Sequence, residues 1–426
     1  MALRVRLEVE RGRRLDRAFA EAAADADGRE RAFARELAYG TTRLRGRIDH
    51  LLGLRLLGPL QGLQPEVREI LRLGSYQLLY MTGVPAYAAV SASVDLVRAR
   101  VGPRPSGLVN AVLRQVGRAG ENPELYPSPA NDPLGFLETW GSHPRWLLER
   151  WLARWDAPTV RRLVEVNNGR PPTFLVPLDV PPDDAVAALA HAGLVATALA
   201  GTTPRIQLGD GVAPTDALAV LPRAIVQDAA SNLVARYADV PEGTKVADLC
   251  AAPGGKALAL ADRPVYTLAA DRSESRLHMV KENARRVGRP LGLVVADARR
   301  PPLRRVDVVL LDAPCSGTGT FARRPDARWR LRPESIGELA ALQLEMLDAA
   351  ADVVAHGGLL VYSTCSLERE ENEAQVDAFL DRHPDFSTEP TTAVPPEHLD
   401  ELGRLFVTPQ ETGSDGGFAA RLRRAA

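Results

Sequence analysis

Hydrophobic residues recur at helical spacing along the front of the chain. The pattern predicts one long helical stretch over residues 30–57, whose apolar positions are Phe33, Leu37, Leu44, Ile48 and Leu51. Further helices are predicted over residues 65–83, 87–100 and 108–118. The front of the chain is therefore expected to be an all-helical bundle.

The pattern changes twice further along the chain. Four prolines between positions 121 and 133 predict a linker. Residues 140–222 are mixed, with an extended stretch at 171–177 and a helix at 185–191, and predict a small α+β module. Four of the five tryptophans fall within this region, at positions 140, 146, 151 and 155, where we expect them to pack a small helical piece.

From about residue 240, strands and helices alternate. Short apolar runs predict strands at 245–250, 265–270, 291–296, 306–311 and 359–362, and helices are predicted at 274–287, 334–356 and 370–381. Alternation with continuous apolar strands is typical of a parallel sheet covered by helices on both faces. Residues 405–408 and 417–422 add a terminal antiparallel pair. The fold class is multidomain: a helical bundle (1–125), a small α+β linking module (132–222) and an α/β domain (223–426).

Composition narrows the class of protein. The 426 residues carry a formal net charge of −1 and are 45% hydrophobic, which excludes a disordered or fibrous chain. No apolar run is long enough to span a membrane, and the N-terminus lacks the apolar core of a signal peptide, so we expect a cytoplasmic protein. The three cysteines, at positions 250, 315 and 365, have no zinc spacing, so no metal site and no disulfide are expected.

Charge is unevenly distributed. Residues 1–130 hold 20 arginines and 14 acidic residues, whereas the rest of the chain holds 33 basic and 40 acidic residues. Local clusters at positions 11, 13, 14 and 17 and at 43, 45 and 47 add to this basic front. The asymmetry indicates that the front meets a polyanion such as RNA. Nothing in the sequence indicates the oligomeric state.

Polar and reactive residues follow each predicted strand of the α/β domain. In a parallel sheet, ligands bind outside the carboxyl ends of the strands, so these residues should share one edge. They are the turn 250–256 (Cys250, Ala251, Ala252, Pro253, Gly254, Gly255 and Lys256), then Asp271, then Asp297, then Asp312 with Cys315, and finally Cys365.

The glycine turn after the first strand indicates a nucleotide-like ligand without phosphates. A P-loop is excluded, because Ala257 replaces the hydroxyl residue and Cys250 the first glycine, and the dinucleotide pattern of three glycines is absent. Asp271 lies where an acid binds ribose hydroxyls, and Asp297 could accept from an adenine amine. Ribose and adenine without phosphates predict S-adenosylmethionine as the cofactor.

The cysteines indicate the acceptor. Carbon-5 of a pyrimidine is a poor nucleophile, but a thiolate that adds at carbon-6 converts the ring into an enamine. One cysteine is then needed as nucleophile, and a second can help to resolve the methylated adduct. Cys365 precedes a predicted helix, where thiolates are favoured, whereas Cys250 has the surroundings of a small buried residue.

Three strings carry a specific resemblance: Cys-Ala-Ala-Pro-Gly-Gly-Lys (250–256), Asp-Ala-Pro-Cys-Ser-Gly-Thr-Gly (312–319) and Ser-Thr-Cys-Ser (363–366). They resemble the NOL1/NOP2/Sun RNA cytosine-5 methyltransferases, as do the strings at 226–231 and 324–329. The resemblance implies a class I, Rossmann-like methyltransferase domain. It implies that Cys365 is the nucleophile and that Cys315 assists product release. It also implies that the cofactor is held by the turn 250–256, Asp271, Asp297 and Asp312, and that Asp312 touches the cytosine as well.

The helical front resembles a NusB-like RNA-binding domain, through residues 70–81, 84–90 and 110–114. Its fusion to this methyltransferase resembles the RsmB-type branch, which methylates small-subunit ribosomal RNA. One departure is that Thr-Phe-Leu-Val-Pro-Leu (173–178) stands where the family has Arg-Val-Asn. A basic and an amide side chain are thus missing from the linking module.

Two alternatives stay open: a transfer RNA cytosine-5 methyltransferase, and a non-catalytic RNA-binding or assembly factor that uses the helical front. Retention of every catalytic string disfavours the second. A DNA cytosine methyltransferase is also disfavoured, because those enzymes use the cysteine of the Pro-Cys turn as nucleophile and would not need Cys365.

Overall fold

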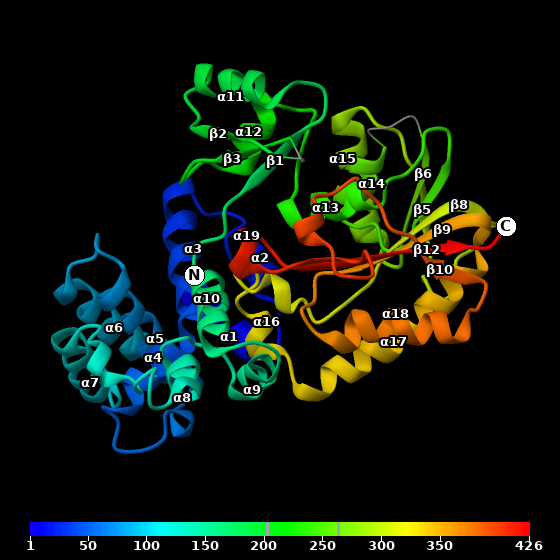
Figure 1. The fold of residues 1–426 in the computed structure, drawn as a ribbon. Helices are drawn as coiled ribbons and strands as arrows, with labels where there is room; N and C mark the ends of the chain where they lie inside the picture. Colours follow the sequence, from blue (N-terminus) through cyan, green and yellow to red (C-terminus); the bar gives the residue numbers. More distant parts are fainter. Residues whose placement is uncertain (202–203, 262–264) are drawn as a thin grey trace. The chain divides into compact units, whose positions relative to one another are not determined.

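The computed structural model describes residues 1–201, 204–261 and 265–426, which form two compact units (Figure 1). Unit 1 comprises Met1–Arg170 and Phe321–Leu331, and unit 2 comprises Pro171–Thr320 and Arg332–Ala426. This division falls after residue 170 rather than in the proline-rich stretch, and it assigns a short segment of the predicted α/β domain to unit 1. The three-domain division stays a prediction.

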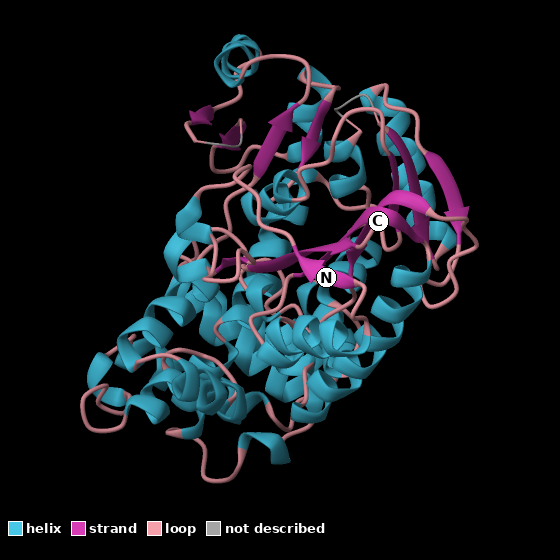
Figure 2. Cartoon of the chain, turned by 45° about the vertical axis from the view of Figure 1, so that its right-hand side comes forward, coloured by secondary structure: helices cyan, strands magenta, loops and turns pink. Residues whose placement is uncertain are grey.

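Unit 1 is helical, as the apolar spacing predicts (Figure 2). Asp27 caps α3 by accepting from the Glu30 amide at 2.7 Å. The long helical stretch expected over 30–57 is interrupted at Leu44. The backbone angles of Leu44 are not helical, so α3 and α4 are separate helices. The α-helices are α1 (Ala2–Glu10), α2 (Leu15–Ala22), α3 (Gly28–Arg43), α4 (Arg45–Gly53), α5 (Pro65–Tyr80), α6 (Ala86–Arg100), α7 (Ser106–Ala119), α8 (Pro133–Thr139), α9 (Arg145–Arg154), α10 (Ala157–Asn168) and α16 (Ala327–Arg330).

The proline-rich stretch 121–133 packs against α4 of unit 1. Tyr126 is buried and stacks on the ring of His50, whose Nε2 lies 2.7 Å from the Leu125 carbonyl. Trp151 is buried, as expected for a packing role, and Trp140 stacks on Phe136.

The returning segment 321–331 is anchored inside unit 1 by two side chains. Arg328 is fully buried and donates to the Asn168 side chain at 2.7 Å and to the Asn167 carbonyl at 2.8 Å. Trp329 donates to the Thr42 carbonyl at 2.9 Å. The chain that follows the Asp-Ala-Pro-Cys string is thereby held by the helical unit.

Many arginines of the front belong to the interior of unit 1. Arg6 and Arg72 are fully buried and both contact the buried Glu69, with Arg6 Nε 2.7 Å from the carboxylate. Arg72 also pairs with Asp49 at 2.7 Å. Of the clusters that indicated a polyanion-binding face, Arg47 is buried and pairs with an acidic residue. Some of the arginines at the front are therefore structural, although their acidic partners leave the net positive charge of residues 1–130 unchanged.

We expect Glu69→Gln to lower the free energy of unfolding by about 3 kcal/mol or more, because it leaves the buried Arg6 and Arg72 without their shared charge. Urea unfolding followed by helical circular dichroism measures this. The matched change Glu165→Gln removes an exposed pair with Arg161 and should cost at most about 0.5 kcal/mol. Equal effects of the two changes would contradict the assignment.

Unit 2 contains a small sheet and a large one. The small sheet has the strand order β2-β3-β1-β4, all antiparallel, with α11 and α12 packed on its buried side. The departure from the family pattern falls on β1, whose backbone pairs with both β3 and β4. The elements are β1 (Phe174–Pro177), α11 (Pro182–His191), β2 (Ala196–Leu199), β3 (Arg205–Leu208), α12 (Pro214–Val220) and β4 (Ala224–Val226).

The large sheet has the order β10-β12-β9-β8-β5-β6-β7, and β11 also pairs with β12. Strands β9, β8, β5, β6 and β7 are parallel, whereas β12 runs antiparallel to its three neighbours β9, β10 and β11. The strands are β5 (Lys245–Asp248), β6 (Tyr266–Asp271), β7 (Gly292–Val295), β8 (Val306–Asp312), β9 (Val354–Thr364), β10 (Phe386–Thr388), β11 (Leu405–Val407) and β12 (Gly417–Arg424). The predicted α/β fold and its terminal antiparallel strands are confirmed.

Both faces of this sheet are buried, which explains its continuous apolar strands. Val309 and Leu311 of β8 pack on one face with α17 and α18, and Val308 and Leu310 pack on the other with α14 (Figure 1). The predicted helix 334–356 extends too far at its C-terminal end. The observed helix ends at Asp352, because Val354 already pairs with Val306 as the start of β9. The helices are α13 (Ala229–Tyr237), α14 (Gly255–Leu260), α15 (Glu274–Val287), α17 (Pro333–Asp352), α18 (Glu373–Arg382) and α19 (Pro409–Thr412). Among the described residues, no helix is long and apolar enough to cross a membrane.

Candidate active site

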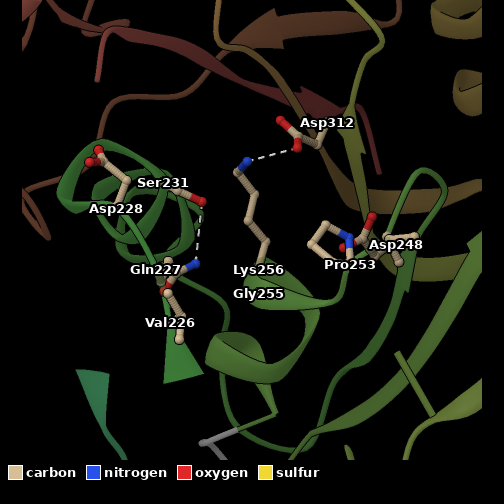
Figure 3. A pocket seen from close by; sticks show the side chains of 11 residues that line it. Val226, Gln227, Asp228, Ser231, Asp248, Pro253, Gly255, Lys256 and Asp312 are labelled. Carbon is tan, nitrogen blue, oxygen red and sulfur yellow. Dashed lines mark hydrogen bonds and ion pairs between the residues drawn. The ribbon is translucent and has the colours of Figure 1, made fainter. Parts of the chain in front are cut away.

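The order of the strands places a crevice between β5 and β8. Strand β5 lies in the middle of the parallel strands. The next two strands in the sequence, β6 and β7, lie on one side of it, and the following two, β8 and β9, lie on the other side. In sheets of this kind, ligands bind outside the carboxyl ends of the two strands at which the direction reverses. Those ends carry Asp248 and Asp312. A pocket lies there, lined by Val226, Gln227, Asp228, Ser231, Asp248, Ala251, Ala252, Pro253, Gly255, Lys256 and Asp312 (Figure 3).

Lys256 and Asp312 form an ion pair across this pocket. The Lys256 Nζ atom lies 2.7 Å from a carboxylate oxygen of Asp312 (Figure 3). Ser363, at the end of β9, donates to the other carboxylate oxygen at 2.9 Å. Burial alone would lower the pKa of Lys256, but Asp312 and the nearby Cys365 raise it above its ordinary value, so the amine stays charged.

Asp248 is a buried carboxyl group that lines the pocket and has one oxygen without a hydrogen-bond partner. Its Oδ1 accepts from the Cys250 amide at 3.2 Å, whereas Oδ2 is buried without a hydrogen-bond partner. Burial, with a contribution from Asp312, raises the pKa of Asp248 to about 7. A donor group of a bound ligand would satisfy the unpartnered oxygen.

The raised pKa of Asp248 predicts a pH-dependent stability. Between about pH 4 and 7 the folded chain keeps this proton while the unfolded chain has lost it, so the free energy of unfolding falls as the pH rises. Asp248→Asn removes this contribution. As the pH rises from about 4 to 7, the free energy of unfolding of the variant should therefore increase relative to that of wild type by up to about 4 kcal/mol. The midpoint of urea unfolding at pH 4.5, 6 and 7.5 measures it.

Asp297→Asn is the control for that experiment. A hydrogen bond from Arg299 lowers the pKa of Asp297 to about 2, so its contribution is lost only as the pH falls below about 4. Its profile should run parallel to that of wild type between pH 5 and 7. A parallel profile for Asp248→Asn would contradict the prediction.

The glycine turn packs tightly against α15. Gly254 has φ +105°, a left-handed conformation that side chains rarely adopt, and its position would place a Cβ 3.2 Å from Val280. The adjacent Cys250 packs against the hydrophobic core instead of lining the pocket, and burial raises the pKa of its thiol. This agrees with the small buried role expected for it.

The other two acidic residues predicted at the strand ends lie beside the pocket rather than in its lining. Asp271 is buried, accepts from the Ser273 amide at 2.9 Å and faces Arg276 at 3.5 Å. Asp297 accepts from the backbone amide of Arg299 at 2.9 Å and pairs with its guanidinium at 2.7 Å.

Cys315 and Cys365 meet on the same edge of the sheet. Their Sγ atoms are 3.3 Å apart, although 50 residues separate them in the sequence. The Gly319 amide donates to the Cys365 carbonyl at 3.0 Å, and a Cβ at position 319 would lie 2.9 Å from that carbonyl oxygen. Glycine is therefore required for this approach.

The two thiols differ in their protonation. The pKa of Cys315 is well above its ordinary value, because its proton is hydrogen-bonded to Cys365 and because the site is buried. The raised pKa favours the protonated thiol at Cys315. The charged Lys256 lies close enough to interact with Cys365. A neighbouring positive charge of this kind favours a thiolate, the form of cysteine that attacks carbon.

The structure brings together most of the residues predicted for the site. It also places in the pocket several residues that were not predicted from the sequence. Gln227, Asp228 and Ser231 reach the pocket from β4 and α13, and they belong to the string at 226–231 that carried part of the family resemblance. Asp248 is the last residue of an apolar strand, and a lone acid there is a signal that could have been used.

Comparison with known proteins agrees with this geometry. A family model described as 16S rRNA methyltransferase RsmB/F matches residues 237–423, and the NusB family model matches residues 1–118. A protein of Synechocystis sp. described as a probable ribosomal RNA small subunit methyltransferase B is 35% identical, over 93% of this chain and 92% of its own length. The chain belongs to the RsmB/F family of 16S rRNA methyltransferases.

Further relatives of this family cover nearly the whole chain. The ribosomal RNA small subunit methyltransferase B of Serratia proteamaculans is 34% identical, over 92% of this chain and 90% of its own. The crystal structure of the protein PH0851 matches with a TM-score of 0.80 at 27% identity, over 99% of this chain and 98% of that chain. Both domain expectations, NusB-like and Rossmann-like methyltransferase, are confirmed.

As a member of the RsmB/F family, this chain is a methyltransferase that uses S-adenosylmethionine and acts on RNA. The pocket fits such a donor, since it is lined by residues of the glycine turn and by a buried carboxyl group with an unpartnered oxygen. In the part of the chain that the structure describes, no cluster of histidine, cysteine and acidic side chains could hold a metal ion.

Proposed function

We propose that this RsmB/F enzyme methylates carbon-5 of a cytosine in 16S ribosomal RNA through a covalent bond between Cys365 and the base. The observation that carries the proposal is the cysteine pair, with two sulfur atoms 3.3 Å apart at the edge of the sheet that bears the pocket. A methyltransferase acting on a nitrogen or a hydroxyl would need neither sulfur. We place the reaction in the cytoplasm, together with its ribosomal substrate.

The cofactor-holding residues follow from the lining of the pocket. We assign this role to the turn 250–256, whose Ala251, Ala252, Pro253, Gly255 and Lys256 line the pocket, and to Asp248 with its unpartnered oxygen. Asp271 and Asp297, at the ends of β6 and β7, are proposed for the ribose and the adenine. When bound, S-adenosylmethionine supplies the electrophilic methyl group.

The cysteines carry out the remaining chemistry in two steps. The Cys365 thiolate bonds to carbon-6, which makes carbon-5 nucleophilic toward the methyl group. Once its sulfur is bonded to carbon, Cys365 no longer shares a hydrogen bond with the Cys315 thiol. Cys315 then releases its proton to solvent water, and the thiolate that remains can act as a base. It then takes the proton from carbon-5, the double bond between carbon-5 and carbon-6 re-forms, and Cys365 leaves as a thiolate.

We infer that Asp312 contacts both the cofactor and the target cytosine. Lys256 and Ser363 fix its carboxylate at the end of β8, three residues before Cys315. We assign it to hold the exocyclic amine of the cytosine as well as to line the cofactor pocket. Because a paired base cannot reach a pocket at the edge of a sheet, the target cytosine must be unpaired or flipped out.

The test is a methylation assay with unmodified 16S rRNA and unmodified transfer RNA in competition, using S-adenosylmethionine with a labelled methyl group. Digestion of the product to nucleosides should place the label in 5-methylcytidine from the 16S rRNA. Label in a different nucleoside would overturn the carbon-5 chemistry, and label confined to transfer RNA would overturn the choice of substrate. Binding of RNA without methyl transfer would favour an assembly factor.

A further inference from the structure

One buried carboxylate, Glu371, touches both turns that carry the cysteines. Its Oε1 accepts from the Ser316 backbone amide at 2.8 Å, and its Oε2 accepts from the Ser366 hydroxyl at 2.5 Å and from the Ser316 hydroxyl. Ser316 directly follows Cys315, and Ser366 directly follows Cys365. A single side chain therefore connects the residues next to both sulfur atoms.

The carboxylate is itself fixed by its surroundings. Gln343 of α17 donates to Oε1 at 3.0 Å and also to the Pro314 carbonyl at 3.0 Å, one residue before Cys315. The Tyr362 hydroxyl, fully buried in β9, donates to the Glu371 carbonyl at 2.6 Å. Glu371 is fully buried and cannot swing away from the two turns without breaking this set.

Every group around the side chain of Glu371 is a donor. Two hydroxyls, one backbone amide and one side-chain amide point at its two oxygens. Burial raises the pKa of Glu371 above its ordinary value, although these donors act in the opposite direction. A carboxyl group buried this deeply is costly unless its hydrogen bonds are complete.

We propose that Glu371 is the positioning residue of the cysteine pair, holding the two turns so that both sulfur atoms face the same base. The inference rests on the proposed function, since it takes Cys365 as nucleophile and Cys315 as the releasing residue. Glu371 touches neither the base nor the cofactor pocket and acts through Ser316 and Ser366. Its substitution should therefore affect the reaction steps more than the binding of either substrate.

The test is Glu371→Gln, which keeps the size of the side chain but replaces one acceptor oxygen by a donor amide. We expect kcat for unmodified 16S rRNA to fall by about 100-fold, as for a displacement of about 1 Å in a reacting group. The KM for RNA and the dissociation constant of S-adenosylmethionine should stay within about twofold of wild type. Glu370→Gln, a change at the exposed neighbouring residue, should leave all three constants unchanged.

The step affected is isolated in the Cys315→Ala background, where the covalent RNA–protein adduct is retained. Adding Glu371→Gln there should slow the appearance of the adduct by about the same factor as it lowers kcat. If Glu371→Gln does not fold, Ser316→Ala and Ser366→Ala replace it, and each should lower kcat by about 10-fold through loss of one hydrogen bond to the carboxylate.

The outcomes separate the inference from the function on which it rests. Wild-type kcat in Glu371→Gln, together with an inactive Cys365→Ala, would overturn the positioning role alone. A loss of cofactor affinity as large as the loss of kcat would also overturn it, because it would indicate a general structural role. Full activity in Cys365→Ala would instead overturn the proposed nucleophile, whatever Glu371→Gln does.

Discussion

Cys365→Ala is expected to reduce methyl transfer to 16S rRNA by more than about four orders of magnitude, because loss of a covalent nucleophile removes the pathway itself. The structure supports this assignment over Cys315 through the surroundings of the two sulfur atoms. The contact with Cys365 and burial raise the pKa of Cys315 well above its ordinary value, whereas Cys365 lies near the charged Lys256. Transfer of labelled methyl groups to unmodified 16S rRNA, followed over hours, measures the loss.

Two controls make this result specific. The variant should bind S-adenosylmethionine as wild type does, since Cys365 is not among the residues that line the pocket. Its thermal midpoint should change little, because alanine is smaller than cysteine and the position is only partly buried. Retention of as much as a tenth of the wild-type rate would mean that another group attacks carbon-6.

The fold of this chain could be predicted largely from its sequence because local pattern and tertiary burial agree. The strands of the large sheet are buried on both faces, and their apolar runs show this directly. The break at Leu44 could not be predicted, since the apolar spacing continues through it. Nor could the inclusion of segment 321–331 in unit 1, because buried polar contacts such as those of Arg328 leave no periodic signal.

The site was predictable where residues follow a strand, and less so elsewhere. The glycine turn, Asp312 and the two cysteines were found because parallel strands end at one edge of the sheet. Glu371 was missed because it follows no strand and reaches the cysteine turns only through the packing of α17 and β9 around it. Counting arginines along the sequence has a similar limit, since it cannot distinguish Arg6 or Arg72, which are buried in ion pairs, from exposed arginines.

Cys315→Ala is expected to have the opposite signature from Cys365→Ala: chemistry proceeds as far as the methylated adduct and then stops. Without the sulfur 3.3 Å from Cys365, no base of the cysteine pair is left to take the proton from carbon-5, so the bond between Cys365 and carbon-6 persists. Expressed in cells, this variant should yield a protein band of reduced mobility that ribonuclease restores to normal. Sequencing the RNA in that band would identify the target nucleotide and decide between ribosomal and transfer RNA.

The double variant Cys315→Ala/Cys365→Ala is the matched control, and it should give no band of reduced mobility. A band that persists in the double variant would show that the adduct forms elsewhere on the chain. If Cys315→Ala gives no band but methylates at the wild-type rate, the release step does not need the second sulfur, and the proton on carbon-5 must go to another base. Of the groups near Cys365, Asp312 would then be the first to examine, because Ser363 and Lys256 already hold its carboxylate at the same edge of the sheet.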